Sequence, residues 1–131
     1  MLKEDSIEKV EREFGVRFPS DFVCYIKKYN GGYPTSNILI VDGREEMINN
    51  FLSFNEDDIT YVVEHYEDIK EYMPEDIYPF ARDAADNLIC FDFSSSNVSV
   101  VFWDYEVAYK DKLFACTFIA KSFTELIDKL R

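Results

Sequence analysis

Residues 87–103 read NLICFDFSSSNVSVVFW, two apolar runs on either side of a short polar segment. The runs at 87–93 and 98–103 have the length and apolar content of β-strands, and residues 94–97 (SSSN) are typical of a turn. The second run is apolar at nearly every position, which is typical of a central strand covered on both faces. The stretch therefore predicts two neighbouring strands of a sheet that lies in the core.

The rest of the chain adds strands and helices around this pair. Apolar runs bounded by turn residues predict further strands at 37–41, 50–54, 78–82 and 113–120. A turn around Asp42-Gly43 separates the first two of these strands. Helical spacing of apolar residues predicts helices at 6–14, 19–29, about 57–72 and 122–130.

Several helix ends carry residues suited to that position. Gly15 ends the first helix, and residues 30–32 (NGG) tolerate the positive φ angles of a helix C-terminus. Pro74 stops the long mid-chain helix, and Ser122 with Glu125 forms a capping box at the start of the last one. The sequence therefore predicts an α+β fold. Its largely antiparallel sheet of about six strands is flanked by N-terminal helices, a mid-chain helix and a C-terminal helix.

The composition indicates one ordered domain. The chain has 131 residues, of which 47% are hydrophobic and 17% aromatic. A domain of this length buries roughly two thirds of the surface that its unfolded chain exposes, and disordered chains are poor in aromatic residues. We therefore expect residues 1–131 to form a single domain with an ordinary hydrophobic core.

The charge is strongly acidic. Fourteen Lys and Arg residues stand against 26 Asp and Glu residues, which gives a formal net charge of −12. Binding to nucleic acid or to an anionic membrane surface requires cationic side chains, so this charge argues against both and favours a basic protein partner. The three cysteines form no C-x-x-C pair, and neither a signal segment nor a long apolar run occurs. These features predict a cytoplasmic protein.

Motifs for catalysis and metal binding are scarce. His65 is the single histidine, so a nucleophilic triad would have to use it, and motifs with two histidines are excluded. The cluster of Asp83, Asp86, Asn87 and Asp92 lacks the spacing of a calcium loop and is typical of a turn. A carboxylate pair acting as general acid and base stays open, because 26 acidic residues provide many chance pairs. We expect no cofactor, no metal ion and no enzymatic activity.

Most of the negative charge lies in one segment. Residues 56–92 contain twelve acidic and two basic residues, which carry −10 of the net charge of −12. On a helix over 57–72 the apolar and the acidic residues fall on opposite sides. The expected core side consists of Ile59, Val62, Val63, Tyr66, Ile69 and Met73. The acidic side consists of Asp57, Glu64, Glu67, Asp68 and Glu71, with Tyr61, His65 and Tyr72 along one border.

The acidic side allows two interpretations. It is a solvated face that aids solubility, or it is a docking surface where carboxylates steer a basic partner and tyrosines supply contact area. For a docking surface the candidate residues are Glu64, Asp68 and Glu71 for charge, with Tyr61 and Tyr72 for contact. A second acidic candidate, near strand ends, consists of Asp83, Asp86 and Asp104.

Three blocks of sequence occur in the order found in one protein superfamily. Residues 18–32 read FPSDFVCYIKKYNGG, residues 77–92 read IYPFARDAADNLICFD, and residues 100–106 read VVFWDYE. The first is a helix that ends at Asn-Gly-Gly, the second a hairpin, and the third a strand that ends in Trp and an acid. Together they resemble the SUKH superfamily of Smi/Knr-related proteins, except that Ala85-Asp86 stands where glycines are common in relatives.

The resemblance implies an α+β fold and a role in protein binding without catalysis. Most bacterial relatives look like immunity proteins that neutralise a toxin, frequently a nuclease, and fungal relatives look like regulators of cell-wall synthesis and signalling. We therefore expect a SUKH-type immunity protein that occludes the basic groove of a toxin with its acidic surface. A regulatory adaptor without a toxin partner is the alternative. The resemblance also implies fold-forming roles for Pro19, Gly31, Gly32 and Trp103, with Trp103 lining a groove as the other interpretation.

Overall fold

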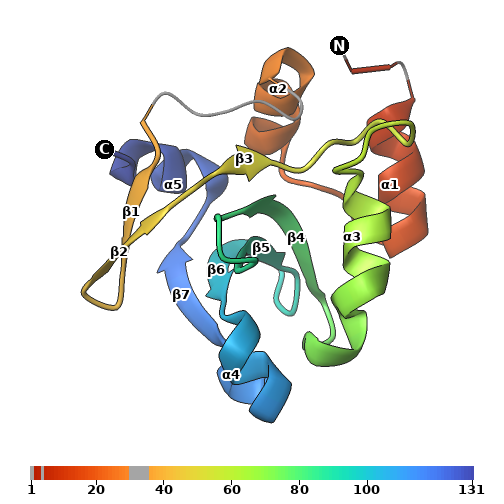
Figure 1. The fold of residues 1–131 in the computed structure, drawn as a ribbon. Coiled ribbons are helices and arrows are strands. Elements are labelled where there is room, and N and C mark those ends of the chain that lie inside the picture. Colours follow the sequence, from red (N-terminus) through yellow and green to blue (C-terminus); the bar gives the residue numbers. More distant parts are fainter. Residues whose placement is uncertain (1, 4, 30–35) are drawn as a thin grey trace.

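The computed structural model describes residues 2–3, 5–29 and 36–131 (Figure 1). These residues form a five-stranded sheet, a two-stranded sheet and five α-helices. The predicted α+β fold is confirmed. The predicted Asn-Gly-Gly end of the second helix, at residues 30–32, lies outside the described residues.

The larger sheet is antiparallel throughout and has the strand order β3-β4-β5-β6-β7. Its strands are β3 Asn50–Phe51, β4 Ile77–Arg82, β5 Leu88–Asp92, β6 Ser99–Trp103 and β7 Cys116–Ala120. The last four form a meander in which each strand pairs with the next. Between β5 and β6, Leu88 pairs with Trp103 and Cys90 pairs with Val101. The hairpin predicted from residues 87–103 is therefore confirmed.

A hairpin forms the smaller sheet, in which β1 Ile38–Val41 pairs with β2 Arg44–Met47. In its turn, Asp42 and Gly43 have φ angles of 51° and 78°. A two-residue hairpin turn with both φ angles positive favours Asp-Gly, which explains the short connection. The predicted strand at 50–54 is wrong beyond Phe51. The polar strand β2 was not predicted, because it lacks the apolar alternation of a half-buried strand.

Three predicted helices are confirmed: α1 Ser6–Phe14, α2 Ser20–Tyr29 and α5 Phe123–Lys129. Gly15 ends α1 in the left-handed conformation at a φ of 72°, and its N–H donates to the Glu11 carbonyl at 2.8 Å. At the start of α5, the Ser122 hydroxyl accepts a hydrogen bond from the Glu125 N–H at 3.1 Å. This is the contact that the capping-box pattern predicts.

The mid-chain helix is shorter than predicted. It consists of α3 Val62–Ile69 followed by a 3₁₀ turn, η1 Lys70–Tyr72. The preceding chain is held in a loop by Ser53, whose N–H donates to the Thr60 carbonyl at 2.9 Å and whose carbonyl accepts from the Val62 N–H at 2.8 Å. Ile59 lies in this loop and is 99% exposed, so its predicted place in the core is wrong.

A further helix was not predicted. Between β6 and β7 lie α4 Tyr105–Lys110 and a 3₁₀ turn, η2 Lys112–Phe114. The Asp104 carboxylate caps α4 by accepting from the Val107 N–H at 3.2 Å, and the Asp111 carboxylate caps η2 by accepting from the Leu113 N–H at 3.1 Å. Because both caps start helical turns, the strand predicted at 113–120 begins only at Cys116.

Apolar side chains cover both faces of the larger sheet. Val100 and Phe102 of β6 belong to the cluster formed with α1, α2 and α5, and Val101 and Trp103 belong to a second cluster that includes Ala108 of α4. In Figure 1, α4 lies at the opposite end of the molecule from α2. The prediction of a strand buried on both faces is therefore confirmed for β6. Trp103 is fully buried, and this makes it a core anchor rather than a groove residue.

Candidate functional site

The predicted acidic side of the mid-chain helix is exposed to solvent. Glu64 and Asp68 on α3 and Glu71 on η1 all lie at the surface. Among the described residues these three carboxylates have no cation within 4.0 Å, whereas neighbouring Glu67 pairs with Lys70 at 2.7 Å. Asp57 was predicted to share this face. It lies instead in the loop before α3, where it forms an ion pair with Lys3, so that prediction is wrong.

The two predicted contact tyrosines stand at opposite ends of this helix. Tyr61 immediately precedes α3 and is half-buried against the larger core cluster, and burial raises the pKa of its hydroxyl. The ring of Tyr72 stacks on the ring of Tyr109 from α4, with centroids 4.9 Å apart and planes 15° apart. The carbonyl of Tyr72 accepts the Trp103 Nε1–H at 3.1 Å. Tyr72 therefore connects the acidic helix to α4.

Asp83, from the second acidic candidate, builds the turn between β4 and β5. Its side chain is buried, and its carboxylate accepts from the Ala85 N–H at 2.8 Å and the Asn87 N–H at 2.9 Å. The turn interpretation of this cluster is therefore confirmed at Asp83 and Asn87. Asp86 in the same turn has a φ of 68°, and Asp is one of the few residues that tolerate this conformation.

The structure brings the two predicted acidic groups close to each other. β4 of the hairpin contacts α3, and the pKa of His65 on α3 responds to Arg82 and Asp86 of the hairpin as well as to Asp68 of its own helix. From the same hairpin, the Asn87 side-chain carbonyl accepts from the Tyr105 N–H at 2.9 Å, beside Asp104. The hairpin turn thus lies between α3 and the start of α4. We call the exposed carboxylates on this side of the molecule the acidic surface, which consists of Glu64, Asp68, Glu71 and Asp86.

His65 makes the stability of the folded chain depend on pH. Burial lowers its pKa below the ordinary value of 6.5, Arg82 lowers it further, and the carboxylates of Asp68 and Asp86 act in the opposite direction. The unfolded chain therefore binds a proton at a higher pH than the folded chain, so stability falls as the pH falls below about 6.5. We expect His65→Gln to lose less stability than the unchanged chain between about pH 7.5 and about pH 5.5. Urea unfolding at both pH values measures this, and equal losses would contradict it.

An exposed apolar surface was not predicted from the sequence. It consists of the side chains of Tyr105, Val107, Tyr109, Leu113, Phe114 and Phe118, which come from α4, η2 and β7, and we call it the α4–β7 surface. A strand over 113–120 would have placed alternate residues in the core, so its exposed side chains were not foreseen. The available signal was Asp104 directly after the strand, since Asp is a preferred N-cap residue.

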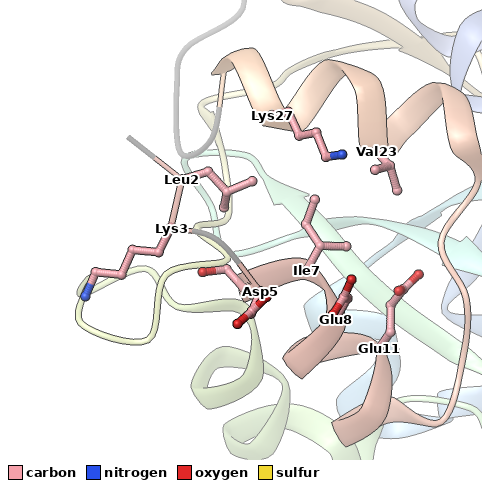
Figure 2. A pocket seen from close by; sticks show the side chains of 9 residues that line it. Leu2, Lys3, Asp5, Ile7, Glu8, Glu11, Val23 and Lys27 are labelled. Carbon is pink, nitrogen blue, oxygen red and sulfur yellow. The ribbon is translucent and has the colours of Figure 1, made fainter.

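A pocket of about 500 Å³ lies apart from both surfaces, between the start of α1 and α2 (Figure 2). Leu2, Lys3, Asp5, Ser6, Ile7, Glu8, Glu11, Val23 and Lys27 line it. The Glu11 carboxylate in its wall accepts from the Phe18 N–H at 2.7 Å, which joins α1 to the segment just before α2. The pocket contains none of the predicted site residues.

Across the described part of the chain, no group of His, Cys, Asp or Glu residues is arranged to hold a metal ion.

Within the same described ranges, no helix has both the length and the apolar character needed to cross a membrane.

Two comparisons with known proteins bear on the identity of the chain. The SPbeta prophage-derived uncharacterized protein YokK of Bacillus subtilis (strain 168) is 26% identical over an alignment of length 144, which covers 96% of this chain and 73% of that protein. The profile of the SMI1 / KNR4 family (SUKH-1) matches residues 1–129. The resemblance of the three sequence blocks is therefore confirmed, and the chain belongs to the SMI1 / KNR4 (SUKH-1) family.

Proposed function

We propose that this chain is an immunity protein that neutralises a cognate bacterial toxin by stoichiometric binding, without catalysis of its own. The acidic surface docks on the basic substrate groove of the toxin and keeps the substrate out. The observation that carries the proposal is the row of exposed carboxylates at Glu64, Asp68 and Glu71, which have no cation of a described residue within 4.0 Å. Membership of the family supports a role in protein binding, and a relative from a bacterium favours the immunity role over the regulatory alternative.

The spacing of these carboxylates favours docking over simple solvation. Glu64 and Asp68 are four residues apart, and Asp68 and Glu71 are three apart, so they are neighbours on the helix surface. Like charges at these spacings destabilise a helix by about 0.2–0.5 kcal/mol per pair. A face that only aids solubility can alternate its charges, as Glu67 and Lys70 do in their ion pair. The charges of Glu64, Asp68 and Glu71 do not alternate in this way, and such a row of carboxylates is useful where it meets a positive surface.

A nuclease is a toxin class that fits this surface. Its substrate groove is basic because it binds phosphates, so the potentials of the two proteins are complementary. Complementary charge raises the rate of association and fixes the orientation of the partner before close contact forms. The tyrosines at the ends of the helix, Tyr61 and Tyr72, then supply amphipathic contact area of the kind found at binding hot spots.

The proposal predicts that a neighbouring reading frame encodes a protein with a C-terminal toxin domain, and co-expression of that domain with this chain tests the function. We expect cells that express the toxin domain to grow only when the chain is present, and the two purified proteins to form a complex of fixed stoichiometry. We also expect the purified chain to block the toxin's activity in vitro when it is equimolar with the toxin. Growth arrest that the chain does not relieve, together with no complex, would overturn the proposal. Substoichiometric inactivation of the toxin would show catalysis and would overturn its mechanism.

A further inference from the structure

The α4–β7 surface is too apolar to be an ordinary solvated surface. Four of its side chains are mostly exposed: Phe114 at 77%, Leu113 at 73%, Tyr109 at 62% and Phe118 at 60%. They lie on successive elements that pack together, since η2 contacts both α4 and β7. Exposed apolar patches of this kind, bordered by charged residues, mark interaction sites. The charges around this surface indicate which partner it fits.

Residues 105–121 are close to neutral although the molecule as a whole is acidic. They contain two acidic residues and three lysines, which gives a formal net charge of +1; these are Glu106, Asp111, Lys110, Lys112 and Lys121. A basic protein attracted by the acidic surface therefore gains nothing here from charge. A second copy of the chain does fit, because a two-fold contact can place the lysines of one copy opposite the acids of the other.

We propose that the α4–β7 surface binds a second copy of this chain, so that the protein is a symmetric dimer. The aromatic residues of this surface are Tyr105, Tyr109, Phe114 and Phe118. At about 200 Å² per aromatic side chain, they expose on the order of 450 Å² per copy, or about 900 Å² in a pair. Leu113, Val107 and the flanking lysines raise this toward the roughly 1,000 Å² that a specific interface needs. The inference stands independently of the toxin-binding function.

Side-chain packing, rather than strand pairing, makes this contact. β7 is the last strand in the order of the larger sheet, and an uncovered edge strand can pair with another chain. On β7, however, the Lys129 ammonium donates to the Ile119 carbonyl at 2.7 Å and so covers part of the edge. Lysine at a sheet edge opposes strand addition. The apolar side chains of η2 and β7, Phe114 and Phe118 above all, therefore carry the interface.

The response to salt distinguishes this contact from binding to a basic partner. Two copies with a net charge of −12 each repel one another, and salt screens that repulsion. Dimerisation should therefore strengthen between about 50 mM and about 500 mM NaCl, where the Debye length falls from about 14 Å to about 4 Å. Attraction between the acidic surface and a basic toxin should weaken over the same range.

Sedimentation equilibrium of the full chain tests the proposal, at protein concentrations up to about 0.5 mM and at both salt concentrations. We expect a monomer–dimer equilibrium that tightens with salt. Phe114→Lys and Phe118→Lys should each weaken dimerisation by at least about tenfold, as for a central interface residue. Ile59→Lys is the matched control, because it adds the same charge at an apolar residue that is 99% exposed but lies in the loop before α3. This control should change the dimer dissociation constant by less than about twofold.

Every result of these measurements either supports the proposed dimer or overturns it. A loss of dimer in both Phe variants, with the control unchanged, supports it, and circular dichroism confirms that these surface variants stay folded. A chain that is monomeric throughout overturns it. If such a monomer loses toxin binding on Phe114→Lys, the α4–β7 surface belongs to the toxin contact instead. A dimer that Ile59→Lys disrupts as strongly as Phe114→Lys also overturns it.

Discussion

Replacement of Phe22 by alanine is expected to lower the free energy of unfolding by about 3–5 kcal/mol. Phe22 of α2 is 0% exposed, and its ring contacts the rings of Phe54, Phe80, Phe91 and Phe123, with centroids 5.0 to 5.7 Å apart. These partners come from the loop after β3, from β4, from β5 and from α5. The substitution removes the centre of the aromatic cluster and leaves a cavity that rings on several different elements cannot all close.

Urea unfolding of Phe22→Ala measures this effect, with two control variants. Phe22→Leu keeps most of the volume and should lose less than half as much stability, since the cost of truncation follows the volume of the cavity. Ile59→Ala truncates a side chain that is 99% exposed, outside the α4–β7 surface, and should change stability by no more than about 0.5 kcal/mol. A loss below about 1 kcal/mol in Phe22→Ala would mean that the cluster repacks freely, contrary to the close packing of protein cores.

The strands of the meander and three of the helices could be predicted from the sequence because their patterns are local. The apolar run that ends at Trp103 is buried on both faces, as its composition indicates. The capping box at Ser122 and Glu125 is formed within four residues and needs no distant partner. In these segments, the side chains that bury surface and the residues that end the element lie close together along the chain.

The mid-chain helix and α4 could not be delimited in the same way, because contacts between distant or polar residues decide them. The helix predicted from residue 57 starts late because Ser53 binds both Thr60 and Val62 through its backbone, a contact that helical periodicity does not reveal. Similarly, α4 depends on a single cap at Asp104, and η2 lies where the apolar content predicted the start of a strand at residue 113. Both errors arose where polar contacts outweighed the hydrophobic pattern.

In the candidate site, too, some features could be predicted from the sequence and others could not. The exposure of Glu64, Asp68 and Glu71 follows from the helical projection, and it holds although the helix begins five residues later than predicted. The closeness of Asp86 to this helix could not be foreseen, because it depends on how the β4–β5 hairpin packs against α3. The α4–β7 surface was missed because α4 and η2, which carry most of it, were not predicted.

Reversing three charges of the acidic surface is expected to have the largest effect on function. In the triple variant Glu64→Lys, Asp68→Lys and Glu71→Lys, we expect association with a basic toxin domain to slow by about tenfold to a hundredfold at low salt. The dependence of the association rate on salt should flatten, because the steering charges are gone. The fold should be kept, since all three side chains are exposed and their mutual repulsion costs at most a few tenths of a kcal/mol per pair.

A matched triple variant separates the acidic surface from the overall charge. Glu8→Lys, Glu45→Lys and Asp128→Lys change the net charge by the same amount at exposed residues of α1, β2 and α5. Stopped-flow association at several salt concentrations, together with growth of toxin-expressing cells, compares the two variants. If the control slows association as much as the first triple, total charge rather than this surface attracts the toxin. If the first triple protects cells as well as the unchanged chain does, the toxin docks elsewhere, because a carboxylate face that meets a cationic groove cannot tolerate six units of reversed charge.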